Sequence, residues 1–241
     1  LQAHVYLKEH KVDSALYHIR KAVKNTATYK EDKLARQFVL YGKILKLTEQ
    51  TDSSFIYFQK ALDWYQKQKH TDSVVYVNVA IAELFRYRNS PQQAKYYITE
   101  AERGLNKNAS ADIVAYMFNR KAAIEALFFD PAKAIAYSQK VIAMKNHITN
   151  KELLLYSYNE LGYQFEKSNP EKSRDYYKQA LKIAEDNNLV LPKIDVLMLL
   201  SRMGSLDDRI NVLVQAYQIA EKIINTDKQF NISYQLHKAY A

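Results

Sequence analysis

The sequence contains few of the residues that build turns, disulfides or metal sites. Its 241 residues include no cysteine, four glycines and four prolines. Without cysteine the chain has no disulfide, no thiol nucleophile and no cysteine-ligated zinc. So few glycines and prolines do not suffice for the turns of a many-stranded sandwich or barrel, or for a glycine-rich phosphate loop. These absences exclude most β-rich folds and several enzyme classes.

Long apolar runs are missing as well. The sequence has no uninterrupted apolar stretch of the length that spans a bilayer, so we expect no membrane-spanning segment. It begins at Leu1 rather than methionine, and we expect the native N-terminus and any signal peptide to lie outside it. The absence of cysteine fits the cytoplasm and the periplasm equally, so the compartment stays open.

The charge is positive but dispersed. Lysine and arginine number 35 against 26 acidic residues, for a net charge of +9. Nucleic acid, acidic membrane surfaces and acidic peptides are the partners that a basic protein can attract. The basic residues form no compact run and are spread along the chain, as on a solvated helix face. Ordinary solubility is the simpler interpretation of the charge.

A motif recurs about every 40 residues. One of its marks is a small or β-branched anchor residue, found at Ala22, Ala61, Ala101, Val141, Ala180 and Ala216. Seven residues before each anchor lies a second small residue, at Ala15, Ser54, Ala94, Ala134 and Ser173, with Arg209 breaking the pattern. Small residues two turns apart allow a neighbouring helix to approach closely. The pattern predicts an array of packed helices.

Helix starts accompany the motif. Ser90–Pro91, Asp130–Pro131 and Asn169–Pro170 each place a capping residue before a proline suited to the first helical position. We expect Asp13 and Asp52 to cap in the same way without the proline. The predicted helix pairs are 1–10 with 13–26, 30–48 with 52–69, 71–88 with 91–106, 110–129 with 131–146, 151–167 with 170–187, and 191–203 with 207–225, followed by a helix from Asp227 to Ala241.

The first helices of these pairs have landmarks of their own. Gly42, Ala82, Ala122 and Gly162 are each 40 residues apart. In the helix 110–129 the same register places charged residues, Lys121 and Glu125, at positions expected to be buried. A rotation of that helix by one or two residues would bring them out, so its register is left open.

The repeat resembles the tetratricopeptide repeat. That family has a small residue in the first helix, then a small residue, an aromatic residue and an alanine in the second. Gly42, Ser54, Phe58 and Ala61 match this pattern, as do Gly162, Ser173, Tyr177 and Ala180, while Ala82, Ala94, Ile98 and Ala101 match it with an aliphatic residue in the aromatic place. The period is longer than the family's 34 residues, the early tryptophan is absent, and the closing proline is displaced. The long, tyrosine-rich form looks most like repeats in bacterial regulators that precede a kinase or DNA-binding domain.

The resemblance implies a single all-α domain, an α-α superhelix, cut from a longer protein. Its right-handed solenoid would contain repeats at about 1–27, 30–69, 71–107, 110–148, 150–188 and 191–225, with a half-repeat at 227–241. In this family the first helices line a concave face that binds a protein or peptide. Carried over, that face contains Arg36, Val39, Lys43, Tyr76, Val79, Glu83, Tyr116, Asn119, Tyr156, Asn159 and Tyr163, together with Lys46, Arg86, Ala123 and Glu166.

The tyrosines of this face have two interpretations. Tyr76, Tyr116 and Tyr156 are each 40 residues apart, which places one phenol on every step of a solenoid. Tyrosine offers a large contact area with a polar tip, and Asn119 and Asn159 can donate to and accept from a peptide backbone. The same rings can instead wedge between adjacent helices as packing. The sequence does not separate the two interpretations.

Other ligands fit the residues less well. The family's carboxylate clamp needs lysines and asparagines on successive first helices. Lys43 and Arg120 are available, but Tyr116 replaces an expected lysine, so a chaperone-tail adaptor is disfavoured. A helical-repeat nucleic-acid binder could use Arg36, Lys43, Lys46 and Arg86, although Glu83 and Glu166 interrupt that surface.

No residue constellation for catalysis is present. The six histidines include no pair at metal-binding spacing, and the sequence has no nucleophile elbow, Walker loop or dinucleotide fingerprint. We therefore expect no enzymatic activity, no metal and no cofactor. The sequence predicts a protein- or peptide-binding scaffold, as the sensory or interaction module of a regulatory protein, with nucleic-acid binding as the alternative.

Overall fold

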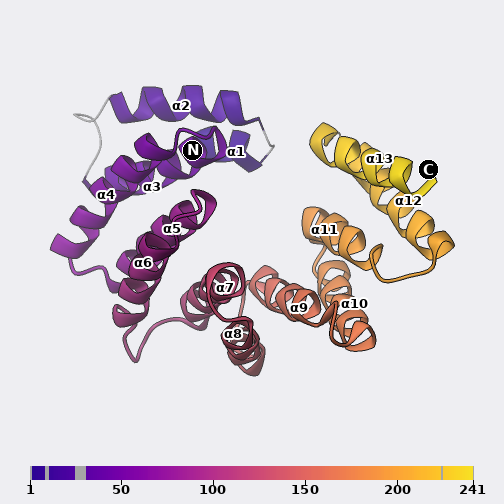
Figure 1. The fold of residues 1–241 in the computed structure, drawn as a ribbon. Coiled ribbons are helices and arrows are strands. Elements are labelled where there is room, and N and C mark those ends of the chain that lie inside the picture. Colours follow the sequence, from indigo (N-terminus) through magenta and orange to yellow (C-terminus); the bar gives the residue numbers. More distant parts are fainter. Residues whose placement is uncertain (1, 9–10, 25–30, 224, 241) are drawn as a thin grey trace. The chain divides into compact units, whose positions relative to one another are not determined.

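The chain folds entirely into helices where its structure is described. The computed structural model describes residues 2–8, 11–24, 31–223 and 225–240. This part contains thirteen α-helices and no strand (Figure 1). In order they are α1 (Gln2–Lys8), α2 (Val12–Lys24), α3 (Glu31–Leu47), α4 (Thr51–Lys67), α5 (Thr71–Tyr87), α6 (Pro91–Arg103), α7 (Ala111–Phe128), α8 (Pro131–Ala143), α9 (Lys151–Phe165), α10 (Pro170–Asp186), α11 (Val190–Leu200), α12 (Leu206–Lys222) and α13 (Thr226–Tyr240).

The helices pack as pairs within two compact units, Leu1–Arg120 and Lys121–Ala241. In the first unit α1 packs on α2, α3 on α4 and α5 on α6, with α2–α3 and α4–α5 contacts between successive pairs. In the second, α9 packs on α10 and α11 on α12, and α13 covers α12. This confirms the predicted all-α repeat of helix pairs, in which every helix begins within one residue of its predicted start. The assignment of all repeats to one domain stays a prediction.

The tight turns between helices use residues other than glycine in the left-handed region. After α3, the Gln50 N–H donates to the Leu45 carbonyl at 2.9 Å and the Glu49 N–H to the Lys46 carbonyl at 3.2 Å. These two bonds satisfy the last carbonyls of the helix. Four turns of the described chain place such a residue at φ between 53° and 59°: Glu49, Lys69, Asn89 and Asn188. Short reversals therefore form in a chain with very little glycine.

The predicted caps are confirmed in part. Asp130 accepts a hydrogen bond from the Ala132 N–H and Asn169 from the Lys172 N–H, each ahead of its proline. Ser90 occupies the N-cap position, but its side chain does not cap α6. The prediction for Asp13 and Asp52 was wrong, because both lie inside the first turn of their helices. At those positions a carboxylate interacts with the helix dipole instead of closing the first turn.

The cores of the helix pairs show two matched packing patterns. In the α3–α4 pair the Phe58 ring covers Gly42, where an added Cβ would lie 2.7 Å from the ring, and the Ser54 hydroxyl donates to the Gly42 carbonyl at 2.7 Å. The α9–α10 pair repeats this arrangement with Gly162, Ser173 and Tyr177. In the α5–α6 pair the equivalent residues are Ala82, Ala94 and Ile98, all buried. A larger residue on the first helix thus accompanies a smaller one on the second.

Helix α7 keeps the register of the repeat in spite of its charges. Lys121 is 9% exposed and Glu125 is 7% exposed, so both are buried and the helix is not rotated to bring them out. The Lys121 ammonium lies 4.7 Å from the centre of the Tyr137 ring, a favourable position for a partly desolvated cation. Aromatic contact therefore offsets some of the cost of burying this lysine.

Candidate functional site

The predicted binding residues lie on α3, α5 and α7 of the first unit and on α9 of the second. Most are partly buried, so they are fixed in place and still reach the surface. Two are not available in this way, since Val79 is 0% exposed and Asn119 is 8% exposed. Val79 packs in the core because α5 is buried on more than one side. We leave it out of the surface considered below.

Four side chains of the first unit form a continuous stack across three helices. The Tyr76 and Tyr116 rings lie face to face, 5.1 Å between centres with planes 22° apart. The Lys43 ammonium lies 4.8 Å from the Tyr76 ring centre, and the Arg120 guanidinium lies 5.6 Å from the Tyr116 ring centre. We call Lys43, Tyr76, Tyr116 and Arg120 the tyrosine stack. Each ring has a cation within the range of cation–π attraction.

A single carboxylate lies beside the stack. Glu83 is 3.4 Å from the Lys46 Nζ and 3.7 Å from the Arg120 guanidinium. Burial raises the pKa of Glu83, but the positive charges of Arg120, Lys46 and Arg86 outweigh burial and hold the pKa below its ordinary value. Glu83 is therefore ionised at neutral pH, and three cations surround one negative charge.

Replacing Glu83 by glutamine is expected to flatten the acid dependence of stability. Because the pKa of Glu83 is lower in the folded protein, the unfolded chain takes up the proton first as the pH falls. The stability from ionised Glu83 is full above the ordinary carboxyl pKa and is lost as the pH falls through the folded-state pKa. We expect Glu83→Gln to be less stable at pH 7, by about 1–3 kcal/mol, since the cations lose their counter-charge.

Urea unfolding of both proteins between pH 7 and about pH 3 measures this effect. The exposed Asp63→Asn on α4 is the control, because it removes a carboxylate that has no such neighbours. Parallel stability curves for wild type and Glu83→Gln would contradict the assignment.

The phenol of Tyr116 stays neutral. Burial raises its pKa well above the ordinary value, Tyr76 and Glu83 raise it further, and Arg120 opposes them. A neutral phenol keeps its O–H, so it can donate a hydrogen bond as well as accept one. The stack therefore offers flat apolar faces, hydroxyl groups and cations on one surface.

The matching face of α9, in the second unit, is built differently. The Tyr156 hydroxyl donates to Glu152 at 2.6 Å. Tyr163 is 56% exposed, and the Asn159 Oδ1 is buried with no hydrogen-bond partner. Glu166 accepts from the Tyr177 hydroxyl at 2.6 Å and lies 3.6 Å from Arg202, so it serves packing within this unit. On α9, Tyr156 and Glu166 therefore make hydrogen bonds and ion pairs within the second unit.

The four cations assigned to the nucleic-acid alternative differ in their surroundings. Arg36 is exposed. Lys43 lies over Tyr76, Lys46 faces Glu83, and the Arg86 guanidinium lies 4.8 Å from the Tyr87 ring centre. Three of the four therefore contact an aromatic ring or a carboxylate, which lowers their availability to phosphates.

One member of the stack lay outside the predicted binding face. The sequence pattern indicates Arg120 only as a possible clamp residue, and it does not belong to the 40-residue series of the other positions. The sequence does indicate Arg120 by its distance from Tyr116. It lies four residues later, one helical turn along α7, and so shares a face with that tyrosine. A search for cations four residues from each tyrosine of the series would have found it.

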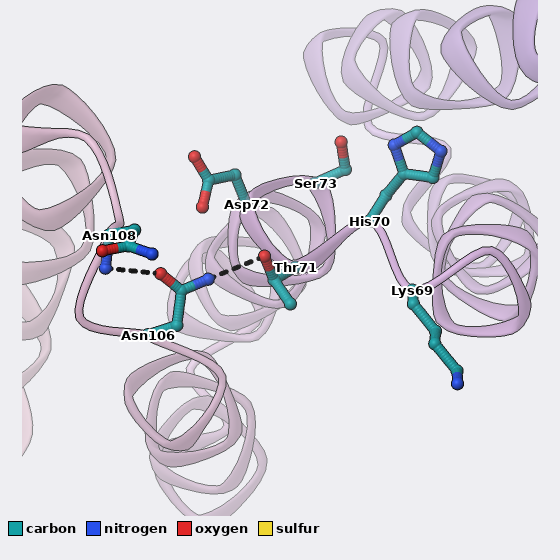
Figure 2. Close-up of a pocket in the computed structure, with 7 residues that line it drawn as sticks. All are labelled: Lys69, His70, Thr71, Asp72, Ser73, Asn106 and Asn108. Atoms are coloured by element: carbon teal, nitrogen blue, oxygen red, sulfur yellow. Dashed lines mark hydrogen bonds between the residues drawn. The ribbon is translucent and has the colours of Figure 1, made fainter.

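Apart from the tyrosine stack, a polar pocket lies at the start of α5 and is shown in Figure 2. The Asn106 side chain donates to the Thr71 hydroxyl at 2.9 Å and accepts from the Asn108 N–H at 2.8 Å. Asn106 thus joins the segment after α6 to the beginning of α5. Its hydrogen-bonding groups are used within the protein, which fits a structural role.

Other kinds of site find little support in the described part of the chain. No group of three or more histidine, aspartate or glutamate side chains there is arranged to hold a metal ion. Among the helices described, none has both the length and the apolar character needed to cross a bilayer.

Solved structures show the same fold at low sequence identity. A STAND protein with a tetratricopeptide repeat sensor, PH0952 from Pyrococcus horikoshii, matches with a TM-score of 0.69 at 13% identity, over 87% of this chain and 34% of its own. A Rap protein complexed with Competence and Sporulation Factor matches with a TM-score of 0.69 at 15% identity, over 99% and 72%. BtubC from P. vanneervenii matches with a TM-score of 0.58 at 13% identity, over 99% and 89%.

These matches define the class of fold. The chain is a tetratricopeptide-like helical repeat of the α-α superhelix class, as the sequence predicted. It spans about a third of the STAND protein. The sequence matches no protein-family model and no curated protein.

Proposed function

We propose that the chain is a non-enzymatic scaffold that binds an acidic peptide or protein segment on the α3–α5–α7 face of its first unit. The observation that best supports this is the tyrosine stack, in which two stacked rings lie between Lys43 and Arg120. Rigid tyrosines provide contact area at little cost in side-chain entropy. A cation at each end adds charge to the contact area that the rings provide.

The charge of the face indicates the kind of peptide. Lys46, Arg86 and Arg120 surround Glu83, and Lys43 lies over Tyr76, so the face has a positive excess even after its ion pairs are counted. A segment with aspartate or glutamate beside an apolar residue complements such a surface. This proposal gives Arg36, at the exposed start of the face, the role of attracting the ligand at longer range.

The structural neighbours support a regulatory setting. The Rap structure was solved with Competence and Sporulation Factor, and the repeats of the STAND protein are described as a sensor. By analogy of fold, we propose that the chain is the sensory or interaction module of a larger regulatory protein. A partner bound along first helices would then be reported to an attached domain.

Selection of peptides from a random library on the whole chain tests the proposal. We expect the selected peptides to be enriched in acidic residues and their affinity to fall as salt is raised. Lys43→Gln should weaken binding about threefold, since it removes a partly exposed charge. The exposed Lys182→Gln on α10 is the matched control and should leave the affinity unchanged.

Two results would contradict the proposal. One is selection of peptides without acidic residues whose affinity is indifferent to Lys43. The other is tight binding of a single-stranded oligonucleotide that Lys43→Gln abolishes, which would favour the nucleic-acid alternative instead.

A further inference from the structure

A cavity of about 560 Å³ lies between α2, α3 and α4, within the first unit. Its lining consists of three cations, Arg20, Lys24 and Lys60, and three aromatic residues, Phe38, Tyr41 and Tyr57, with Val23 beside them. The volume is in the range of cavities that hold small organic ligands. Tyr41 and the tyrosine-stack residue Lys43 are two positions apart on α3, so the cavity opens on a different face of this helix.

The aromatic wall of the cavity is ordered by mutual contact. The Tyr41 and Tyr57 rings lie 4.3 Å apart between centres, and the Phe38 ring lies 5.7 Å from Tyr57. Burial raises the pKa of Tyr57, as does Tyr41, against the opposing effect of Arg20. The Tyr57 phenol is thus neutral at physiological pH. The wall offers flat apolar surface with hydroxyl donors.

Among the described residues, no carboxylate is paired with the cations of the cavity. No acidic residue lines the cavity, and no ion pair joins Arg20, Lys24 or Lys60 to a carboxylate in the described part of the chain. The Arg20 Nε donates to the Tyr41 hydroxyl at 3.3 Å, and the Lys60 ammonium lies 5.0 Å from the Tyr57 ring centre. Three positive charges therefore converge on one aromatic cavity.

The next repeat along the chain, in which α4, α5 and α6 correspond to α2, α3 and α4, provides an internal comparison. There Tyr97 takes the place of Tyr57, so the aromatic ring belongs to the common packing of the repeat. The cations are not common, since Gln59 and Glu100 occupy the places of Arg20 and Lys60. Gln59 donates to the Tyr97 hydroxyl at 2.9 Å, and Glu100 pairs with Arg103. Packing of the repeat thus tolerates an uncharged residue at the position of Arg20 and an acidic residue at the position of Lys60, so packing does not explain these two cations.

We propose that this cavity binds a small organic anion in which a carboxylate or phosphate is attached to a flat apolar ring. The ring lies against Tyr41 and Tyr57, and the anionic group is held by Arg20, Lys24 and Lys60. Guanidinium and ammonium groups are the usual donors to both anions. The site is independent of the peptide-binding face, so either can fail without the other.

Calorimetric titration of the whole chain with four probes tests the proposal. Phenyl phosphate and benzoate carry the ring and the anion, inorganic phosphate carries only the anion, and benzyl alcohol only the ring. We expect phenyl phosphate or benzoate to bind at least about tenfold more tightly than either partial probe, because charge-assisted hydrogen bonds and ring contact each contribute. The two acidic probes also distinguish a phosphate ligand from a carboxylate ligand.

The decisive variant is Arg20→Gln with Lys60→Glu, which gives the cavity the residues of the next step. Since the chain already folds with Gln59 and Glu100 there, we expect unchanged melting and at least about tenfold weaker binding. Lys178→Glu with Lys182→Gln on α10 changes the net charge equally and should bind as wild type does. If the decisive variant melts early, Lys24→Gln replaces it, with the same loss expected.

Three results would overturn the proposal. They are benzoate and phenyl phosphate both binding no more tightly than benzyl alcohol, both binding no more tightly than inorganic phosphate, and wild-type affinity in the decisive variant. Absence of binding by all four probes at millimolar concentration would overturn it as well.

Discussion

Replacing Gly42 by alanine is expected to destabilise the protein by about 1–3 kcal/mol, as overpacking of a filled core does. The added methyl group would lie 2.7 Å from the Phe58 ring, and the ring is itself buried between α3 and α4. The Ser54 hydroxyl, which donates to the Gly42 carbonyl, further limits how far the backbone can move. Chemical unfolding measured by circular dichroism gives the change in free energy.

The neighbouring helix pair, α5 and α6, indicates a second substitution that should relieve the overpacking. Ala82 and Ile98 have the matching repeat positions there and both are buried, so an alanine on the first helix is compatible with an aliphatic residue on the second. We expect Gly42→Ala with Phe58→Ile to be more stable than the sum of the single changes predicts, by about 1 kcal/mol or more. Additive effects in this double-mutant cycle would show that the matched packing pattern is coincidental.

Replacing Tyr116 by leucine is expected to weaken binding of the selected acidic peptides by about 30-fold or more, the loss found at binding hot spots. Leucine keeps apolar bulk next to Tyr76 but removes the stacked ring, its hydroxyl group and the surface that Arg120 covers. The affinity is measured by titration, and thermal melting is recorded for the same samples.

The control for this prediction is Tyr96→Leu on α6. Tyr96 is 59% exposed and lies on a second helix, away from the stack. It should leave the affinity unchanged. If Tyr116→Leu instead lowers the melting temperature and binds peptide as wild type does, the stacked tyrosines serve packing alone.

The sequence predicts the helices well because their signals are local and repeated. Prolines after capping residues and small residues two turns apart set the helix starts and the close contacts, and these rules act within a few positions. Asp13 and Asp52, predicted as caps, lie instead at the second position of their helices. Acidic residues are favoured both at the cap and in the first turn, so composition does not separate these positions.

The functional surface was harder to predict because spacing does not report burial. Val79 has the same repeat position as the partly exposed Val39 and Asn159, but α5 is packed on several sides and buries it. When a helix is apolar nearly all round, its sequence pattern does not show which of its faces is exposed. The sequence analysis missed Arg20 and Lys60 for another reason. Alignment of the repeats shows the residues that all repeats share, and these two charges occur in one repeat only.

The most direct test of the proposed function is to map where a selected acidic peptide binds. Amide chemical shifts of the whole chain, recorded by NMR with and without the peptide, report the contacted helices. The account predicts the largest shifts at Lys43, Tyr76, Glu83 and Tyr116 on α3, α5 and α7. Shifts concentrated on α4 and α6, with those four residues unchanged, would contradict it.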